Sequence, residues 1–231
     1  MIAKILEPGF EGDGKLSNDL HSAFLRGYPI ENLRPLLISK SETVLGTAAF
    51  LVTELGWVVH PFVAEIVDLL YQPRARVRFD AIQALARCTT PDDGWALGRV
   101  LQLLGDPDDF VRGGAMWFIR VSSRWQLRAA LDNAAPQKPD SVFSEIQSMY
   151  LRRGRYCSTD IIRAFIKHPH PIARRFGVGL AARPRLIVDE TLLSIAIASE
   201  DEEIRDRAAE FRGWIFPADA ILSSAFIDQI S

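Results

Sequence analysis

Residues 61–88, PFVAEIVDLLYQPRARVRFDAIQALARC, and residues 94–121, GWALGRVLQLLGDPDDFVRGGAMWFIRV, carry one pattern twice. In each copy an apolar segment containing Leu-Leu precedes a turn with proline, and Val-Arg-x-x-Ala opens a second apolar segment. The equivalent residues Val77 and Val111 lie 34 positions apart. Self-similarity at a period of about 20–50 residues is typical of repeat arrays, so this stretch decides the fold before any catalytic motif is weighed.

The same register extends in both directions along the chain. Six copies follow one another at spacings of 33, 34, 31, 31 and 31 residues when they are aligned on Val44, Val77, Val111, Val142, Ala173 and Ile204. Apolar or small residues recur seven places before, four places after and seven places after each of these reference residues. Such positions share one face of a helix, and a small residue four places after the reference in five of six copies lets helices approach closely. The pattern predicts six helical hairpins between Pro29 and Trp214, of which the fourth, with a proline-containing loop at Pro136–Asp140, is the weakest.

The two ends of the chain depart from the repeat. Residues 1–15 are rich in glycine and show no helical period, so they are interpreted as an N-terminal extension. Ser17 is predicted to cap a helix that ends at Gly27, and a last helix after Pro217 is predicted to cap the stack. Residues 16–231 are predicted to form a single domain.

The repeats resemble HEAT repeats of the short bacterial type, also described as phycobilisome-lyase-type HEAT repeats. The residues that carry the resemblance are Asp106–Ala115, Val77-Arg78-x-x-Ala81 and Ile204-Arg205-x-x-Ala208. The resemblance implies an all-α solenoid wound as a right-handed superhelix. It also implies that the arginines after the reference positions, namely Arg78, Arg112, Arg174 and Arg205, bond to acidic residues or carbonyls of adjacent turns as a ladder. It says little about function, because this architecture hosts scaffolds, adaptors and a few enzymes.

Charge is distributed unevenly along the chain. The net charge of −2 combines −4 for residues 1–71, +9 for residues 72–185 and −7 for residues 186–231. A basic centre between acidic ends bears on the choice of partner rather than on the fold. Two cysteines without a metal or disulfide spacing indicate a cytoplasmic, reduced protein. No segment offers about 18 uncharged apolar residues, so no membrane partner is expected.

The central arginines exceed what a ladder needs, and they outnumber lysine strongly. Because the planar guanidinium favours carboxylate and phosphate recognition, we expect some of them to bind a partner. The candidate partner-binding residues are Arg74, Arg76, Trp117, Arg120, Arg124, Arg152, Arg153, Arg155 and Arg175. A solvated basic face is the equally weighted alternative.

No catalytic signature, cofactor motif or complete metal site is found. His168-Pro-His170-Pro holds two histidines with only Asp160 nearby, so a prolyl turn is favoured over a metal site. HEAT-repeat di-iron hydroxylases use paired His-Glu dipeptides, and none occurs here. HEAT-like alkylpurine DNA glycosylases use an aromatic cleft with an acid, for which Asp80 or Asp106 would serve, but packing and turn roles explain these residues better.

The sequence therefore predicts a non-catalytic protein–protein interaction scaffold that binds a partner with an acidic patch on its concave, arginine-rich surface. Within that class, a bacterial immunity protein that neutralises a toxin is the more concrete hypothesis. A nucleic-acid-binding protein or a DNA glycosylase relative is the less favoured alternative, and a role in chromophore attachment is a third.

Overall fold

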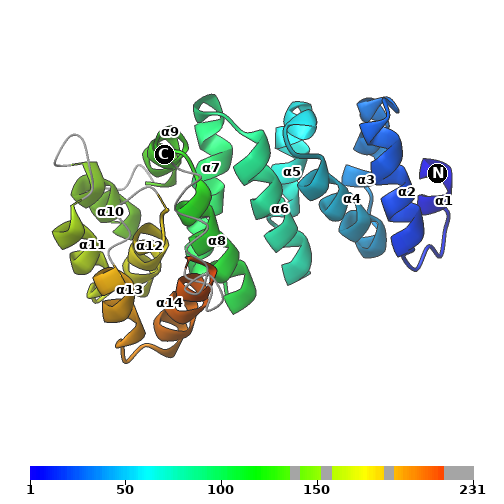
Figure 1. The fold of residues 1–231 in the computed structure, drawn as a ribbon. Coiled ribbons are helices and arrows are strands. Elements are labelled where there is room, and N and C mark those ends of the chain that lie inside the picture. The colour runs from blue at the N-terminus through cyan, green and yellow to red at the C-terminus, as the bar shows by residue number, and fades with distance from the viewer. Residues whose placement is uncertain (136–140, 152–157, 185–189, 216–231) are drawn as a thin grey trace, which may run out of the picture. The chain divides into compact units, whose positions relative to one another are not determined.

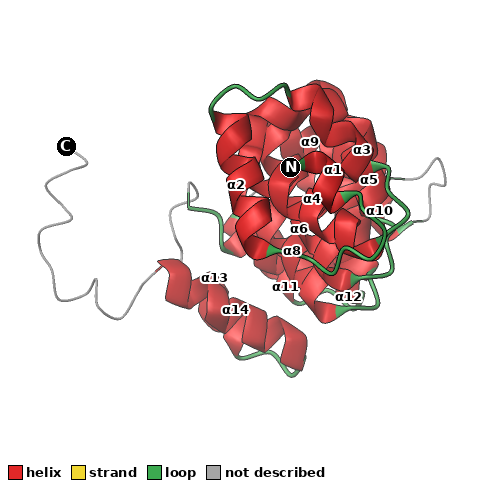
Figure 2. Cartoon of the chain, turned by 90° about the vertical axis from the view of Figure 1, so that its right-hand side faces the viewer, coloured by secondary structure: helices red, strands yellow, loops and turns green. Residues whose placement is uncertain are grey.

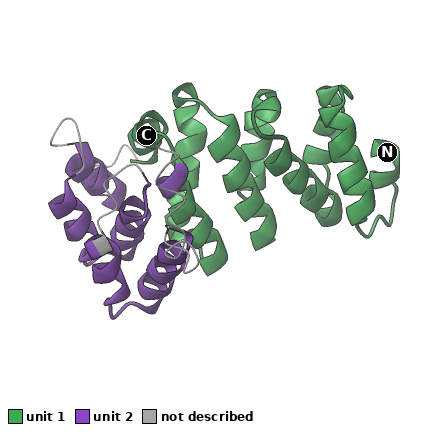
Figure 3. Ribbon diagram, viewed as in Figure 1, with its two compact units in different colours: residues 1–118, 122–137 green, residues 119–121, 138–231 purple. Residues whose placement is uncertain are grey.

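The computed structural model describes residues 1–135, 141–151, 158–184 and 190–215. Within these ranges the chain folds into helices joined by turns, with no strand (Figures 1 and 2). The residues form two compact units, one made of residues 1–118 and 122–137 and the other of residues 119–121 and 138–231 (Figure 3). The single domain predicted for residues 16–231 stays a prediction.

The first unit contains two short N-terminal helices, three hairpins and one further helix. Its α-helices are α1 (Ile2–Ile5), α2 (Gly14–Leu25), α3 (Arg34–Leu37), α4 (Glu42–Leu55), α5 (Val63–Leu69), α6 (Ala75–Cys88), α7 (Gly94–Gln102), α8 (Asp109–Val121) and α9 (Arg124–Ala134). Short 3-10 turns η1 to η4 cover Ile30–Leu33, Gly56–Phe62, Pro91–Asp93 and Leu103–Gly105. The first helices of the hairpins contact one another in order, α3 with α5, α5 with α7 and α7 with α9. The second helices form the other layer, in which α2 contacts α4 and α4 contacts α6.

The second unit repeats this arrangement. Its helices are α10 (Val142–Leu151), α11 (Thr159–Ile166), α12 (Pro171–Ala181), α13 (Glu190–Ile197) and α14 (Glu202–Ile215). Helices α11 and α13 contact each other in one layer, and α12 contacts α10 and α14 in the other. The predicted capping helix after Pro217 and the loop at Pro136–Asp140 lie outside the described residues.

The core follows the predicted register. All six reference residues lie within second helices, and all six residues four places later are buried. All but four of the repeat positions are buried, and these four are half-buried. Three of the four belong to the fourth copy, namely Ala135, Val142 and Met149. The prediction that the fourth copy is the least regular is therefore confirmed, as is the all-α hairpin architecture.

Glycines mark the places where helices touch through their backbones. A Cβ on Gly98 of α7 would lie 2.8 Å from the Asn133 carbonyl carbon in α9, and one on Gly177 of α12 would lie 2.8 Å from the Ile166 nitrogen in α11. A Cβ on Gly114 of α8 would likewise lie too close to a neighbouring helix, in this case to the side-chain ring of Phe79 in α6. Since native packing leaves no room for an added methyl group there, close helix approach explains glycines that cost about 1 kcal/mol each in helix propensity.

The predicted arginine ladder is present in both units. Arg78 donates from Nε and Nη2 to the two carboxylate oxygens of Asp106, at 3.0 and 2.9 Å, and from Nη1 to the carbonyls of Gln72 and Pro73. Arg174 donates from Nε and Nη2 to one carboxylate oxygen of Asp201, Oδ2, at 3.0 and 2.7 Å, and from Nη1 to the carbonyls of His168 and Pro169. Each of these arginines therefore closes its own turn and joins it to the next one.

Two predictions for the N-terminal region are wrong in detail. The N-terminal extension contains a helix, α1, which its glycine content and lack of helical period did not predict. Helix α2 is capped by Asp13 rather than Ser17, because the Asp13 carboxylate accepts from the amides of Lys15 and Leu16. A carboxylate is as good an N-cap as a serine hydroxyl and also suits the positive end of the helix dipole.

One described helical run, Glu42–Leu69, is long and apolar enough to cross a membrane by length and composition alone. Half of its most apolar part is buried within the first unit. Gly56, at φ +59°, also interrupts the run between α4 and η2.

Candidate functional site

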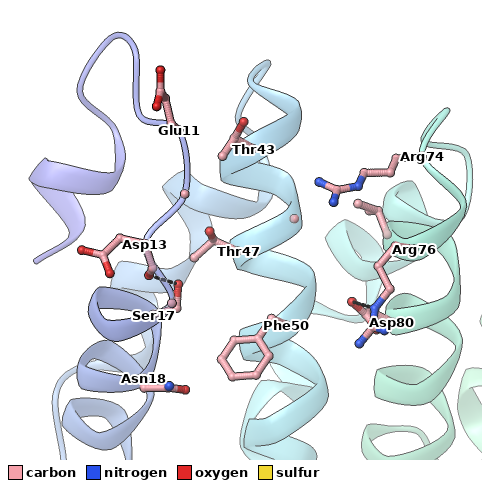
Figure 4. Close-up of a pocket in the computed structure, with 14 residues that line it drawn as sticks. Glu11, Asp13, Ser17, Asn18, Thr43, Thr47, Phe50, Arg74, Arg76 and Asp80 are labelled. Carbon is pink, nitrogen blue, oxygen red and sulfur yellow. Dashed lines mark hydrogen bonds and ion pairs between the residues drawn. The ribbon is translucent and has the colours of Figure 1, made fainter.

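A groove of about 520 Å³ opens on the second-helix layer of the first unit. It is lined by the segment before α2, by α2 itself, by α4 and by the start of α6, and we call it the α2–α4–α6 groove (Figure 4). The groove is open, so it would leave much of an occupant exposed, whereas small-molecule sites bury most of their ligand.

Helix α4 forms the floor of the groove. Thr43, Gly46, Thr47 and Phe50 line it, at positions one before and two, three and six after the reference residue Val44. Phe50 is the largest apolar group of the lining, and its ring meets the His21 ring of α2 edge-on, with centroids 6.5 Å apart. The floor thus combines hydroxyl groups with one aromatic side chain.

One wall is basic and belongs to α6. Arg74 and Arg76 are exposed and line the groove together, as Figure 4 shows. Arg76 pairs with Asp80 at 2.9 Å, and its guanidinium carbon lies 5.8 Å from the centroid of the Phe79 ring. Arg74 is the N-cap residue of α6, and its Nη1 lies 3.4 Å from where a Cβ of Gly46 would be. Arg74 therefore lies against α4, over the floor.

Asp80 is a buried carboxyl at the base of this wall, only 4% exposed. Burial raises the pKa of Asp80 above its ordinary value of 3.8, although the hydrogen bond from Arg76 and the charges of Arg76 and Arg74 act in the opposite direction. Arg76 therefore bonds directly to Asp80, whereas Arg74 acts on Asp80 through its charge alone.

The opposite wall is acidic and comes from the segment before α2. Glu11 is exposed, and Asp13 uses one carboxylate oxygen to cap α2. Gly12, at φ +99°, turns the chain beside Thr43. A Cβ atom on Gly12 would lie 3.4 Å from the Cγ2 atom of Thr43. Because φ near +99° favours glycine, Gly12 fixes how Glu11 and Asp13 flank α4. The groove therefore has walls of opposite charge on the two sides of one helix.

The remaining predicted binding residues are scattered. Trp117 of α8 is half-buried, and Arg124 is exposed at the first residue of α9. Arg175 is paired with Glu203 of α14, at 3.0 and 2.8 Å. Arg120 is half-buried, and its guanidinium carbon lies 5.7 Å from the centroid of the Trp214 ring. Arg152, Arg153 and Arg155 lie outside the described residues. Of the nine residues, the structure brings Arg74 and Arg76 together in one hollow.

The sequence reasoning missed the acidic wall and the floor. The floor could have been found, because Thr43 and Thr47 occupy the repeat positions of Arg76 and Asp80, at one before and three after the reference residue. The acidic wall carries no such signal, since Glu11 and Asp13 belong to no repeat and their approach to α4 depends on the turn at Gly12.

Other groups with chemical potential have structural roles. His170 Nδ1 accepts from the Ile172 amide and His168 Nδ1 from the His170 amide, so the predicted prolyl turn is confirmed. No group of three potential metal ligands occurs in the described ranges. Cys88 is fully buried, and burial raises the pKa of its thiol to about 12, which makes it a poor nucleophile.

The chain is an all-α repeat protein of the solenoid class. Its structure is similar to that of two engineered proteins. The first is 16% identical with a TM-score of 0.51, and the match covers 93% of this chain and 94% of that chain. The second is 14% identical with a TM-score of 0.50, and the match covers 93% of this chain and 96% of that chain. A designed armadillo repeat protein in complex with the peptide (KR)4 gives a TM-score of 0.49 at 13% identity, covering 93% of this chain and 97% of that one. No protein-family model and no curated protein matches the sequence. At these identities the likeness defines the fold alone.

Proposed function

We propose that this protein is a non-catalytic protein-binding scaffold whose docking site is the α2–α4–α6 groove. The observation that carries the proposal is the groove itself, in which Arg74 and Glu11 stand on opposite walls without an internal partner. Within the described part of the chain, neither side chain forms a hydrogen bond or an ion pair. By contrast, the ladder arginines Arg78 and Arg174 spend their guanidinium groups on aspartates and carbonyls.

The mixed charge of the groove argues for a protein rather than a nucleic acid. A phosphate backbone needs a contiguous positive surface, and here Glu11 and Asp13 would oppose it. A protein segment can present both charge signs together with an apolar side chain for Phe50. Neutralisation of a toxin, the more specific hypothesis from the sequence, would be one instance of such binding.

For the repeats themselves we propose the HEAT type. The support is that each hairpin has two principal helices and that a rung from an arginine to an aspartate joins successive turns, at Arg78–Asp106 and Arg174–Asp201. Armadillo repeats, in contrast, are built from about three helices.

Site-specific photo-crosslinking tests the docking site. A benzophenone amino acid is placed at Asn18, which lines the groove, or at its neighbour Asp19, which is exposed and lies outside it. In cells of the source organism we expect a discrete crosslinked protein at position 18 that is absent at position 19 and is lost when Arg74→Glu is added. Equal crosslinking at both positions, or a product insensitive to Arg74→Glu, would contradict the proposal. Titration with labelled duplex DNA near 50 mM salt is expected to show no binding, because counterion release would make any phosphate contact strongest there.

A further inference from the structure

The charge arrangement of the α2–α4–α6 groove specifies more than a protein partner; this inference rests on the proposed function. The two walls hold charges of opposite sign, and the strongest unsatisfied charge on each wall is Glu11 on one side and Arg74 on the other. The remaining charged residues are already in use, since Asp13 caps α2 and Arg76 pairs with Asp80. The groove therefore presents one free negative and one free positive group.

Both groups come from elements that lie against α4. The backbone of Gly12, next to Glu11, lies against Thr43, while the guanidinium of Arg74 lies against Gly46. Helix α4 contacts α2 on one side and α6 on the other, and Glu11 precedes α2 whereas Arg74 opens α6, so the two charges flank a single helix (Figure 4). A helix with side chains is about 10–12 Å across. The free charges are therefore separated by roughly that distance.

This separation matches an extended peptide. At about 3.3 Å per residue, 10–12 Å corresponds to three or four residues of extended chain. An extended segment across the floor would pass Thr43, Thr47 and Asn18, whose hydroxyl and amide groups can bond to a peptide backbone. Phe50 would meet an apolar side chain between the two charged ones.

A uniformly charged segment does not fit this groove. A run of lysines or arginines meets repulsion from Arg74, and a run of glutamates meets repulsion from Glu11 and Asp13. Like charges that face each other across an interface cost affinity, whereas complementary ones set specificity and register. The position of the two walls therefore determines where the basic and the acidic side chain of the ligand lie.

We propose that the α2–α4–α6 groove binds an extended peptide segment that carries one basic and one acidic side chain about three or four residues apart, with an apolar residue between them. The basic side chain lies at Glu11 and the acidic one at Arg74.

Fluorescence anisotropy with short labelled peptides tests this assignment on the full chain. The probes are glycine-serine peptides with one phenylalanine between a lysine and a glutamate, made in both charge orders and with the charges adjacent, three or four residues apart, or far apart. Peptides with only lysines or only glutamates complete the set. We expect the peptides with both charges at the intermediate spacing to bind about tenfold more tightly than the uniformly charged peptides.

The decisive variant reverses one of the two charges. Glu11→Arg leaves basic side chains on both walls and is expected to shift the preference from the mixed peptides to the glutamate-only peptides, an outcome that general weakening or misfolding cannot produce. The matched control, Glu31→Arg, changes an exposed charge that does not line the groove and should leave the preference unchanged.

Equal affinity for the mixed and the uniformly charged peptides would overturn the assignment. An unchanged preference in the Glu11→Arg variant would overturn it as well. If the crosslink at Asn18 persists while these peptides fail, the groove is a docking site for a ligand of different chemistry. If both fail, the proposed function falls too.

Discussion

The rung between Arg78 and Asp106 gives a stability prediction whose size follows from its geometry. The side chains of the pair are only 11% and 6% exposed, and four hydrogen bonds surround the guanidinium. Removing Arg78 leaves the Asp106 carboxylate buried without its cation and two turn carbonyls without their donor. Breaking a buried ion pair by removing one partner costs about 3–5 kcal/mol. We therefore expect Arg78→Ala to lower the free energy of unfolding by about that amount.

Urea unfolding followed by far-ultraviolet circular dichroism measures this loss, with Arg99→Ala as the control. Arg99 is exposed on α7 and bonds only to Gln102, so its removal should change the free energy of unfolding by less than about 0.5 kcal/mol. A double-mutant cycle with Asp106→Asn should give a coupling energy of about 1.5–3 kcal/mol. A loss below about 1 kcal/mol for Arg78→Ala, or a coupling energy near zero, would refute the reasoning that the ladder holds the turns together.

Three further predictions concern packing and pH. Gly98→Ala is expected to destabilise by up to about 2 kcal/mol, because overpacking against the α9 backbone costs about 1–3 kcal/mol and the gain in helix propensity offsets about 1 kcal/mol of it. Gly213→Ala, with open space around it in α14, should instead stabilise, as thermal unfolding would show. Burial raises the pKa of Asp201, but the hydrogen bond from Arg174 outweighs this effect, and the pKa lies below 3.8. The carboxylate therefore stabilises the fold above pH 3.8, and this contribution is lost as the pH falls through the lowered pKa. Asp201→Asn should be less stable than the parent protein at pH 7 and equally stable in acid. The pH dependence from Asp80 has the opposite sign. Because its pKa is raised, the folded state binds an extra proton above pH 3.8, and stability declines as the pH rises through that pKa. Asp80→Asn should flatten this decline in urea unfolding measured from pH 4 to 7.

The repeat register was predictable because packing imposes it locally. Val77 and Ala81 must face the same neighbours one helical turn apart, and each copy restates that requirement, so the hairpins follow from periodicity. The ladder was predictable from the resemblance, since Arg78 and Arg174 stand at one fixed place in the repeat.

The groove was only half predictable. Arg74 and Arg76 stood out as arginines beyond the ladder, but residue type does not separate a free guanidinium from a paired one. Arg175, also outside the ladder positions, is paired with Glu203, which follows 28 residues later and could not be assigned from the sequence. Glu11 escaped notice because its place depends on a single turn at Gly12 in a segment without periodicity.

The rung from Arg78 to Asp106 also bears on how such a chain can change in length. Its basic member lies at the start of α6 and its acidic member just before α8, 28 residues later. A tandem duplication of residues 75–108, which are 34 residues long like the spacing from Val77 to Val111, would therefore repeat Arg78 and Asp106 together. The added hairpin would carry its own rung. The first copy of α6 would still follow α4, so the α2–α4–α6 groove beside the N-terminal segment would be kept.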